Sequence, residues 1–389
     1  MPTEHARLCL VVGHLGRGGL EKQACLLATG LAGRGFEVSV VSLSQGGAWV
    51  DALAVKGIPV VQLRRLGPFD LWRLARLVSA FREMRPDLVY AFNYPTTVYA
   101  RLAGLVASVP VLVTGERAIY MNRLQAGLER LLSRVTDCVI CNAEAIRGDL
   151  VKRVGIPAGT VLTVRNGVEA GPPPTPKERG AARALLGVPE EGFLVGTVGH
   201  IEDVKNLSML VEVAHEVRRK GLPARFCVVG GGSRTGALRS QIRARGLDDA
   251  FILTGERAAA AELLPAFDVF VLTSLSEGLP NTVMEAMAVG LACVCTDVGG
   301  CRELVLEGTS GFLVPLNDTT GMARRLLELA GDAGLRASLG AAGRARILRE
   351  FPVDRLLTQT EGVLRDLLSA RDASPRGRRL LGRPATAAE

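Results

Sequence analysis

The chain has 389 residues, of which 48% are hydrophobic and 22% charged, and this composition excludes a disordered or fibrous protein. Its length predicts two domains, and its net charge of +8 favours an anionic partner. Nucleic acid is a poor candidate for that partner, because aromatic residues make up only 4% of the chain and no nucleic-acid-binding motif is present.

The positive charge is placed unevenly, in the N-terminal half of the chain and in its C-terminal tail. Residues 1–170 carry a net charge of +7 and residues 371–389 carry +3, so the stretch between them is at −2. The basic N-terminal half favours peripheral contact with an anionic membrane or a lipid phosphate. An arginine-rich composition that serves no such contact is the alternative.

Neither a membrane span nor a signal peptide is expected. Uncharged apolar runs stay short of the roughly 18 residues that cross a bilayer. The longest of them, 103–115, is interrupted by Pro110, and Glu4 stands where a signal peptide would be basic. We therefore expect a cytoplasmic protein that can lie at the inner face of the membrane.

In chain order, the first half alternates strand-like and helical segments. Helical periodicity is found in intervals that include 71–84 and 123–134. The apolar, strand-like runs are 8–12, 37–43, 87–92, 109–115, 136–144 and 160–167. Strands that alternate with helices predict a parallel α/β sheet, here in an N-terminal domain over residues 1–170.

The second half repeats this plan after a Pro-rich segment, 171–180, that is typical of a linker. Strand-like runs at 193–199 and 224–230, with a helical stretch at 207–220 between them, predict a second domain over 181–352. Both domains thus open with a strand, a glycine-bearing turn and a helix, as Rossmann-like domains do. A helix is expected at 353–370, followed by a disordered basic tail at 371–389.

The eight cysteines are predicted to be reduced core residues. Cys138 and Cys141 lie in one strand-like run, where their side chains point to opposite faces, so they are poor candidates for chelating one metal. Since the chain also has only four histidines, we expect no metal and no other bound cofactor.

The segment Thr273–Gly290 carries the sharpest chemical pattern. A strand ends in a loop, and a helix is expected to begin near Pro280-Asn281 and to stop at Gly290. The open N–H groups and the dipole of a helix start favour an anion such as a diphosphate. Glu277 and Glu285 would repel that anion unless they bind neutral hydroxyls, as of a sugar and a ribose. A capping residue and a surface carboxylate are the structural alternative.

Three other segments contain residues suited to an anionic ligand. In Gly199–Asn206, Lys205 is one of only six lysines and can meet phosphate as a point charge, while His200 assists when it is protonated. Paired glycines in Val298–Glu303 allow close backbone approach. The glycine-rich loop His14–Glu21 also opens a helix, but it lacks the GxGxxG pattern and the ribose-binding acid of a dehydrogenase, so we disfavour that activity.

Six motifs together resemble the retaining glycosyltransferases of family 4. They are EGLPNTVMEAMAVG with its E-x7-E spacing, VGGCRELV, VGHIEDVKN, VRNGVE, LTGERAAAAELLPAFDVFVLTS and GGLE, and the resemblance covers roughly residues 7–370. It implies a GT-B fold, in which two Rossmann-like domains with parallel sheets face each other across a cleft. The C-terminal domain would hold a nucleotide-sugar donor and the N-terminal one the acceptor, and the helix at 353–370 would cross back to the first domain.

The resemblance also assigns roles to individual residues of the donor site. Lys205 and His200 would act on the departing diphosphate, Glu277 would contact the donor sugar, and Glu285 would hold the ribose hydroxyls. The other residues implied near the sugar, the phosphates or the nucleobase are Gly278, Leu279, Asn281, Gly255, Arg257, Gly18 and Gly19.

The chain departs from the family pattern at two places. The family commonly has Arg where this chain has His200, so the grip on the anion becomes dependent on pH. Many members have a His in the loop after the strand that corresponds to 109–115. Here that loop reads TGERAIY, and Glu116 or Arg117 is expected near the acceptor instead.

The implied reaction is metal-independent transfer of a sugar, with retention at the anomeric carbon, to a cell-envelope polysaccharide or a lipid-linked acceptor. Fixed dipoles and Lys205 would stabilise the charge on the leaving diphosphate. A hydrolysing nucleotide-sugar epimerase on the same fold is the main alternative, although the E-x7-E and GGxxE residues do not match its pattern. A non-catalytic nucleotide-sugar binder is a third reading, which the nearly intact set of donor-side residues disfavours.

Overall fold

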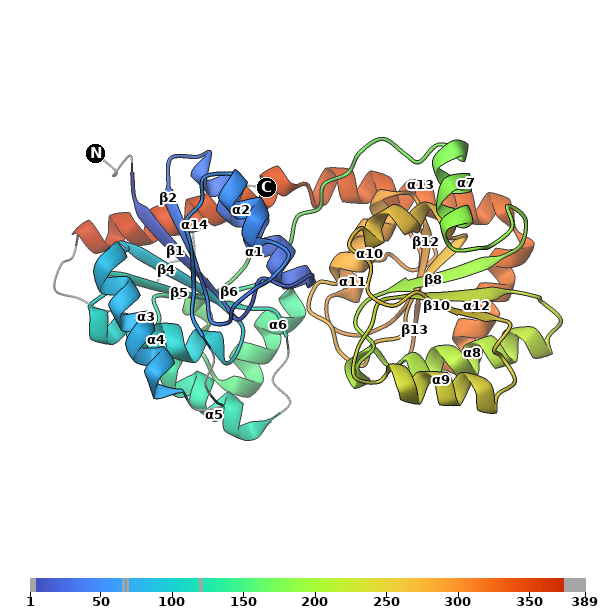
Figure 1. The fold of residues 1–389 in the computed structure, drawn as a ribbon, viewed down its shortest axis with the longest axis horizontal. Coiled ribbons are helices and arrows are strands. Elements are labelled where there is room, and N and C mark those ends of the chain that lie inside the picture. Colours follow the sequence, from blue (N-terminus) through green and yellow to red (C-terminus); the bar gives the residue numbers. More distant parts are fainter. Residues whose placement is uncertain (1–4, 65–66, 68–69, 119–121, 374–389) are drawn as a thin grey trace. The chain divides into compact units, whose positions relative to one another are not determined.

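The computed structural model describes residues 5–64, 67, 70–118 and 122–373, and these form two compact units. Unit 1 comprises the chain up to Gly167 together with the part from Val353 onward, and unit 2 is Val168–Pro352. The C-terminal helix α14 (Val353–Ala373) therefore belongs to unit 1, although unit 2 precedes it in the sequence (Figure 1).

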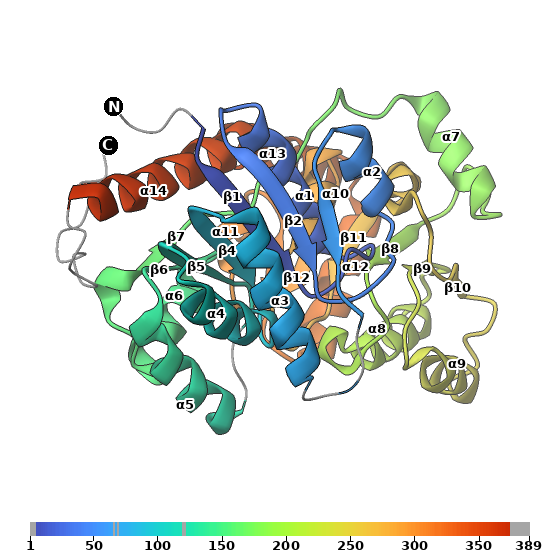
Figure 2. The same ribbon diagram turned by 60° about the vertical axis from the view of Figure 1, so that its left-hand side comes forward.

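Unit 1 is a seven-stranded parallel sheet in the order β3-β2-β1-β4-β5-β6-β7, with helices on both faces (Figures 1 and 2). Its strands are β1 (Arg7–Val12), β2 (Glu37–Ser42), β3 (Val60–Gln62), β4 (Leu88–Phe92), β5 (Val111–Glu116), β6 (Cys138–Cys141) and β7 (Val161–Thr163). Besides α14, its α-helices are α1 (Gly19–Ala32), α2 (Val50–Val55), α3 (Leu71–Met84), α4 (Thr96–Ala107), α5 (Arg123–Leu132) and α6 (Glu144–Asp149).

Two apolar cores lie on opposite faces of this sheet. Along β1, Leu8 and Leu10 pack into the core that α1 and α14 cover, whereas Cys9 and Val11 pack into the core that α3 and α4 cover. Because both faces of β1 are buried, its sequence is a continuous apolar run rather than an alternating one.

Unit 2 is a six-stranded parallel sheet in the order β10-β9-β8-β11-β12-β13. Its strands are β8 (Leu194–Val198), β9 (Arg225–Val229), β10 (Phe251–Leu253), β11 (Val269–Leu272), β12 (Ala292–Thr296) and β13 (Phe312–Val314). Its α-helices are α7 (Pro176–Leu185), α8 (Leu207–Arg219), α9 (Thr235–Ala244), α10 (Asn281–Ala288), α11 (Cys301–Leu304), α12 (Thr319–Gly331) and α13 (Ala333–Glu350). One large core joins α8, α9 and α12 to the sheet.

The proposed linker over 171–180 is wrong in its second half, because α7 begins at Pro176. Thr175 and Glu178 form a reciprocal capping box there, with Pro at the start of the helix, and these contacts stabilise a helix in an otherwise polar segment. At the other end of the chain, α14 includes residues 371–373, and the remainder of the expected tail lies outside the described residues.

All eight cysteines are free and buried, which confirms that they are reduced core residues. Burial raises the pKa of Cys138 to about 12 and that of Cys141 to about 11, so both thiols stay protonated at neutral pH. No helix in the described part of the chain has the length and apolar character needed to cross a bilayer.

Candidate functional site

The centre of the unit 2 sheet is a topological switch point. The chain leaves β8 toward β9 on one side, and β11 pairs with β8 on the other side. The loops that follow β8 and β11 therefore leave the same edge of the sheet next to each other, where open α/β sheets bind their ligands. These loops are 199–206 and 273–280, and both belong to segments that the sequence marks for an anionic ligand.

An ion pair joins the two loops. Lys205 Nζ donates a hydrogen bond to Glu277 Oε1 at 2.6 Å, and Ser274 Oγ donates to the same oxygen at 2.6 Å. The Lys205 and Glu277 side chains are 25% and 12% exposed, so solvent screens this pair only in part. Both bonds use Oε1, and the described residues give Oε2 no partner.

Backbone contacts hold this pair in place. Thr273 Oγ1 donates to the Lys205 carbonyl at 2.8 Å, and the Leu275 N–H donates to the Val204 carbonyl at 2.8 Å. From β12, Thr296 Oγ1 donates to the Ser274 carbonyl at 2.7 Å. The buried hydroxyls thus fix both loops to the sheet, and Lys205 stands on a braced turn rather than on a free loop.

Glycines let the backbone approach closely around Glu277. Gly299 has φ = 50°, and a Cβ there would lie 1.8 Å from the Glu277 carbonyl oxygen. Its neighbour Gly300 donates its N–H to the Gly278 carbonyl at 2.8 Å. The paired glycines of the VGGCRE segment therefore support the loop that carries Glu277, which the sequence interpretation did not specify.

Helix α10 begins directly after this loop, with Pro280 before its first residue, Asn281, as expected. By the geometry of a helix that follows a parallel strand, its first N–H groups and the positive end of its dipole lie at the ligand-binding edge of the sheet. Leu279 is buried, Asn281 is half-buried, and Glu285 lies half-buried one turn into the helix. Gly290 follows the helix with φ = 83°, which suits the expected stop.

The remaining donor-side residues of unit 2 lie at the same edge of the sheet. His200 is exposed, and with Gly199, Lys205 and Ser274 it lines a small hollow at the ends of β8 and β11. Gly255 follows β10, adopts φ = 69°, and accepts a hydrogen bond from the Gly230 N–H at 3.1 Å. Arg257, two residues further along the chain, is exposed. Neither Arg257 nor Gly255 takes part in the Lys205–Glu277 network.

Unit 1 has a second switch point, between β1 and β4. Gly18 precedes α1 and Gly19 begins it. The carboxylate of Glu21 lies 2.0 Å from the position that a Cβ of Gly18 would take, so only glycine fits there without displacing Glu21. His14 Nε2 lies 3.2 Å from Glu21 Oε1, which links the start of the loop to the first turn of the helix.

The expected position of Glu116 in a loop is wrong, because Glu116 is the last residue of β5 and is buried. Arg117 is the first residue after the strand. Its N–H donates to Asn93 Oδ1 at 2.9 Å, its guanidinium bonds to Asn166 Oδ1, and the same group lies over the Phe92 ring. The sequence interpretation assigned no role to Asn93 or Asn166, although Asn166 belongs to the VRNGVE motif.

The described ranges contain no group of three or more His, Cys, Asp or Glu side chains that could hold a metal ion. At the unit 2 edge, Lys205 lies within the hydrogen-bond network, and His200 and Arg257 lie outside it.

Two family comparisons divide the chain nearly as the fold does. Residues 17–171 match the family described as Glycosyltransferase Family 4, and residues 192–332 match the family described as Glycosyl transferases group 1. The segments around Gly18, Arg117 and Asn166 fall in the first match, and those around Lys205, Glu277 and Glu285 in the second.

Curated relatives cover most of the chain. The Escherichia coli protein named UDP-Gal:alpha-D-GlcNAc-diphosphoundecaprenol alpha-1,3-galactosyltransferase is 24% identical over 77% of this chain and 80% of its own length. The Mycobacterium tuberculosis protein named alpha-maltose-1-phosphate synthase is 28% identical over 75% of this chain and 82% of its own length. These relatives do not favour the epimerase alternative.

Solved structures confirm the GT-B fold. The Anabaena protein HepE in complex with UDP-glucose superposes with a TM-score of 0.82 at 23% identity and covers 92% of this chain and 99% of its own. A glycosyltransferase from Rickettsia africae superposes with a TM-score of 0.80 at 17% identity, over 94% and 99% of the two chains.

Proposed function

The chain belongs to the glycosyltransferases of family 4, and we propose that it transfers a sugar from a uridine-diphosphate sugar to a lipid-linked or polysaccharide acceptor of the cell envelope, with retention and without a metal. The observation that carries this proposal is the braced Lys205–Glu277 pair at the switch point of unit 2, beside the N-terminus of α10.

Lys205 is proposed to stabilise the leaving diphosphate. Its ammonium has three N–H donors, and Glu277 uses one of them in this structure. The other two can donate to phosphate oxygens, while the N–H groups at the start of α10 add fixed dipoles. Glu277 neutralises the lysine until the donor arrives, so the site does not keep an unpaired buried cation.

The two carboxylates are proposed to bind hydroxyls rather than phosphate. Glu277 Oε2 makes no bond in the described structure and can accept a hydrogen bond from a hydroxyl of the donor sugar. Glu285 stands one helical turn beyond Asn281 and is proposed to accept from the ribose hydroxyls. This arrangement resolves the apparent conflict of two acids beside an anion site.

The names of the relatives support the choice of substrates. The E. coli relative is named for a UDP-galactose donor and a diphosphoundecaprenol-linked acceptor, and HepE was solved with UDP-glucose. We therefore favour uridine as the nucleobase of the donor. A lipid-linked acceptor would bring the enzyme to a membrane surface, which suits the net charge of +7 over residues 1–170.

In the proposed step, the bond between the anomeric carbon and the diphosphate oxygen breaks, and the acceptor oxygen bonds to that carbon from the same face. The acceptor proton passes to the departing diphosphate. No protein nucleophile is required, and Lys205 with the start of α10 carries the developing negative charge in place of a metal ion.

Thermal unfolding with UDP, GDP and ADP, each with and without EDTA, tests the donor site. Of the three nucleotides, we expect only UDP to raise the melting temperature, by a few degrees at saturating concentration. EDTA should leave that shift unchanged. A shift with GDP or ADP alone, or its loss in EDTA, would contradict the uridine or the metal-free part. Proton NMR of the product reports the anomeric configuration, and inversion would contradict retention.

A further inference from the structure

Exposed apolar side chains gather on one side of unit 1, over α3, α4 and α5. Leu124 is 80% exposed, Leu71 79% and Trp72 63%. Large apolar side chains this exposed on neighbouring helices make this side of unit 1 a candidate interaction surface. The opposite face of the sheet, by contrast, is covered by α1 and α14 (Figure 2).

Helix α5 has the clearest pattern. Its inward face buries Ala126, Glu129 and Leu132. Its outward face carries Leu124 and Leu131, seven residues apart, and beside this apolar row runs a basic row. The basic row consists of the exposed residues Arg123, Arg130 and Arg134, the last of them just beyond the helix.

The only acid of α5 is removed from this surface. Glu129 is buried and accepts hydrogen bonds from Arg101 of α4, which also bonds to Thr114 and Thr136. This pair fixes the rotation of α5, so the two leucines and the arginines face outward. Arg123, Arg130 and Arg134 form no ion pair with any residue that the structure describes. The outward face is therefore cationic and apolar, with no negative charge.

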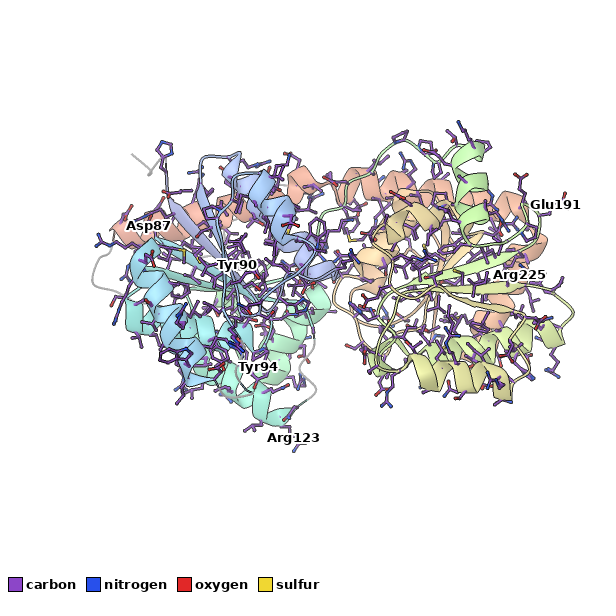
Figure 3. All side chains as sticks on the ribbon, in the orientation of Figure 1. Asp87, Tyr90, Tyr94, Arg123, Glu191 and Arg225 are labelled. Carbon is purple, nitrogen blue, oxygen red and sulfur yellow. The ribbon has the colours of Figure 1, made fainter. Side chains whose placement is uncertain are left out.

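The N-terminal ends of α3, α4 and α5 share one edge of unit 1. Because each helix follows a parallel strand, its first residues lie at the carboxyl edge of the sheet. Leu71 and Trp72 begin α3, Tyr94 lies just before α4, and Leu124 is in the first turn of α5. Figure 3 labels Asp87 just before β4, Tyr90 within it and Tyr94 just after it, which marks the direction toward this edge. Arg117 stands at the same edge, after β5.

We propose that this surface, defined by Leu71, Trp72, Tyr94, Leu124 and Leu131 with the α5 arginines, docks on an anionic lipid bilayer. The apolar row would enter the interface, and the long arginine side chains would reach the lipid phosphates. The proposal rests on the proposed function in one respect, since docking there brings a lipid-linked acceptor to the carboxyl edge that holds Arg117. A partner protein fits less well, because an arginine-only face would need an acidic counterpart, which anionic lipid supplies directly.

Vesicle flotation tests the docking surface. The full chain is expected to float with phosphatidylcholine vesicles that contain about one-third phosphatidylglycerol, and far less with pure phosphatidylcholine. The pair Leu124→Ser and Leu131→Ser should reduce the bound fraction at least about tenfold, since two exposed leucines no longer insert. The matched pair Leu185→Ser and Leu348→Ser, at exposed leucines of unit 2, should bind like the unchanged chain.

Tryptophan fluorescence reports the contact directly. The chain has two tryptophans, and Trp49→Phe leaves Trp72 as the only one. Its emission should shift to shorter wavelength with anionic vesicles and stay unchanged with neutral ones. No flotation of the unchanged chain, equal flotation of both leucine pairs, or an unshifted Trp72 would each overturn the proposal. So would a dimer that Leu124→Ser and Leu131→Ser convert to a monomer, because the surface would then join two copies.

A separate readout keeps this test independent of the proposed function. The Leu124→Ser and Leu131→Ser variant should keep the thermal shift with UDP and the transfer rate to a short-chain, water-soluble acceptor. Flotation without any response to UDP would refute the donor assignment and leave the docking surface standing. A response to UDP without flotation would refute the docking surface alone.

Discussion

The two units have a candidate site at the same place in their parallel sheets, but the side chains at the two sites differ. Each places its candidate site at the switch point of a parallel sheet, between β1 and β4 in unit 1 and between β8 and β11 in unit 2. The unit 2 loops are joined by an ion pair, Lys205–Glu277. In unit 1, by contrast, Arg117 after β5 bonds to the side-chain amides of Asn93 after β4 and Asn166 after β7. The fold thus determines where a site forms, and the side chains determine which ligand it suits.

The largest effect is expected when the unit 2 cation is removed. Lys205→Met should lower the transfer rate about 10²- to 10³-fold, because the leaving diphosphate loses its main stabilising charge. Steady-state kinetics with a UDP-sugar donor measures this, with thermal unfolding as a check on folding. Lys220→Met, at a surface lysine of the same unit, is the control and should be neutral. Comparable rates in the two variants would show that Lys205 has no such role.

The close approach of Gly299 to the Glu277 backbone gives the next test of the unit 2 site. Gly299→Ala places a methyl group against the Glu277 carbonyl and also requires φ = 50°. Gly246→Ala requires a similar φ of 65°, but the built Cβ meets no atom within 4 Å. Urea unfolding should show a loss of about 1–2 kcal/mol for Gly246→Ala and a clearly larger one for Gly299→Ala. Only Gly299→Ala should also weaken UDP binding, and equal losses would argue against the close approach.

A smaller and different effect is expected in unit 1. Arg117→Met removes the charged hydrogen bond from the guanidinium to Asn166 and keeps the backbone N–H bond to Asn93, so the KM for the acceptor should rise about tenfold. The dissociation constant of UDP, measured by calorimetry, should not change. Arg153→Met, at a partly exposed arginine of unit 1, serves as the control. A change in the dissociation constant of UDP instead would contradict the assignment of the acceptor to unit 1 and the donor to unit 2.

The smallest effect concerns the departure from the family pattern at His200. An imidazole is charged only in part near neutral pH, whereas a guanidinium is always charged. His200→Arg should therefore tighten UDP binding about two- to fivefold, as expected for an exposed ion pair. Calorimetry with UDP measures this affinity, and an unchanged dissociation constant would show that His200 does not face the diphosphate.

Local patterns predicted the elements that carry the donor residues. The apolar runs gave β8 and β11, and the Pro280-Asn281 and Gly290 signals gave the bounds of α10 to within two residues. The three-residue edge strands β3, β10 and β13 were missed, since three residues are too few to show a period. The equally short β7 was predicted only because it lies in the longer run 160–167. The start of α7 was missed although its capping box is visible in the sequence, because the prolines before it outweighed that signal.

The position of Glu116 shows a limit of reading apolar runs. The strand was expected to end at Gly115, where the apolar run stops, but β5 continues for one residue and buries the carboxylate. Likewise, the sequence predicts a helix over 123–134, but only the structure shows that the single acid of α5 is paired with Arg101 inside the unit. Whether a charged residue lies inside or outside depends on a partner that is distant in the sequence.

The sequence by itself determined the fold class, the family and the residue types of the donor site, because strand and helix periods and short motifs are local properties. It named Lys205 and Glu277 separately, 72 residues apart. Only the tertiary structure showed that they form one ion pair, because that contact depends on β8 and β11 lying side by side in the sheet. The outward stripe of α5 was likewise decided by the tertiary structure, since the buried Arg101–Glu129 pair sets which face of the helix meets solvent.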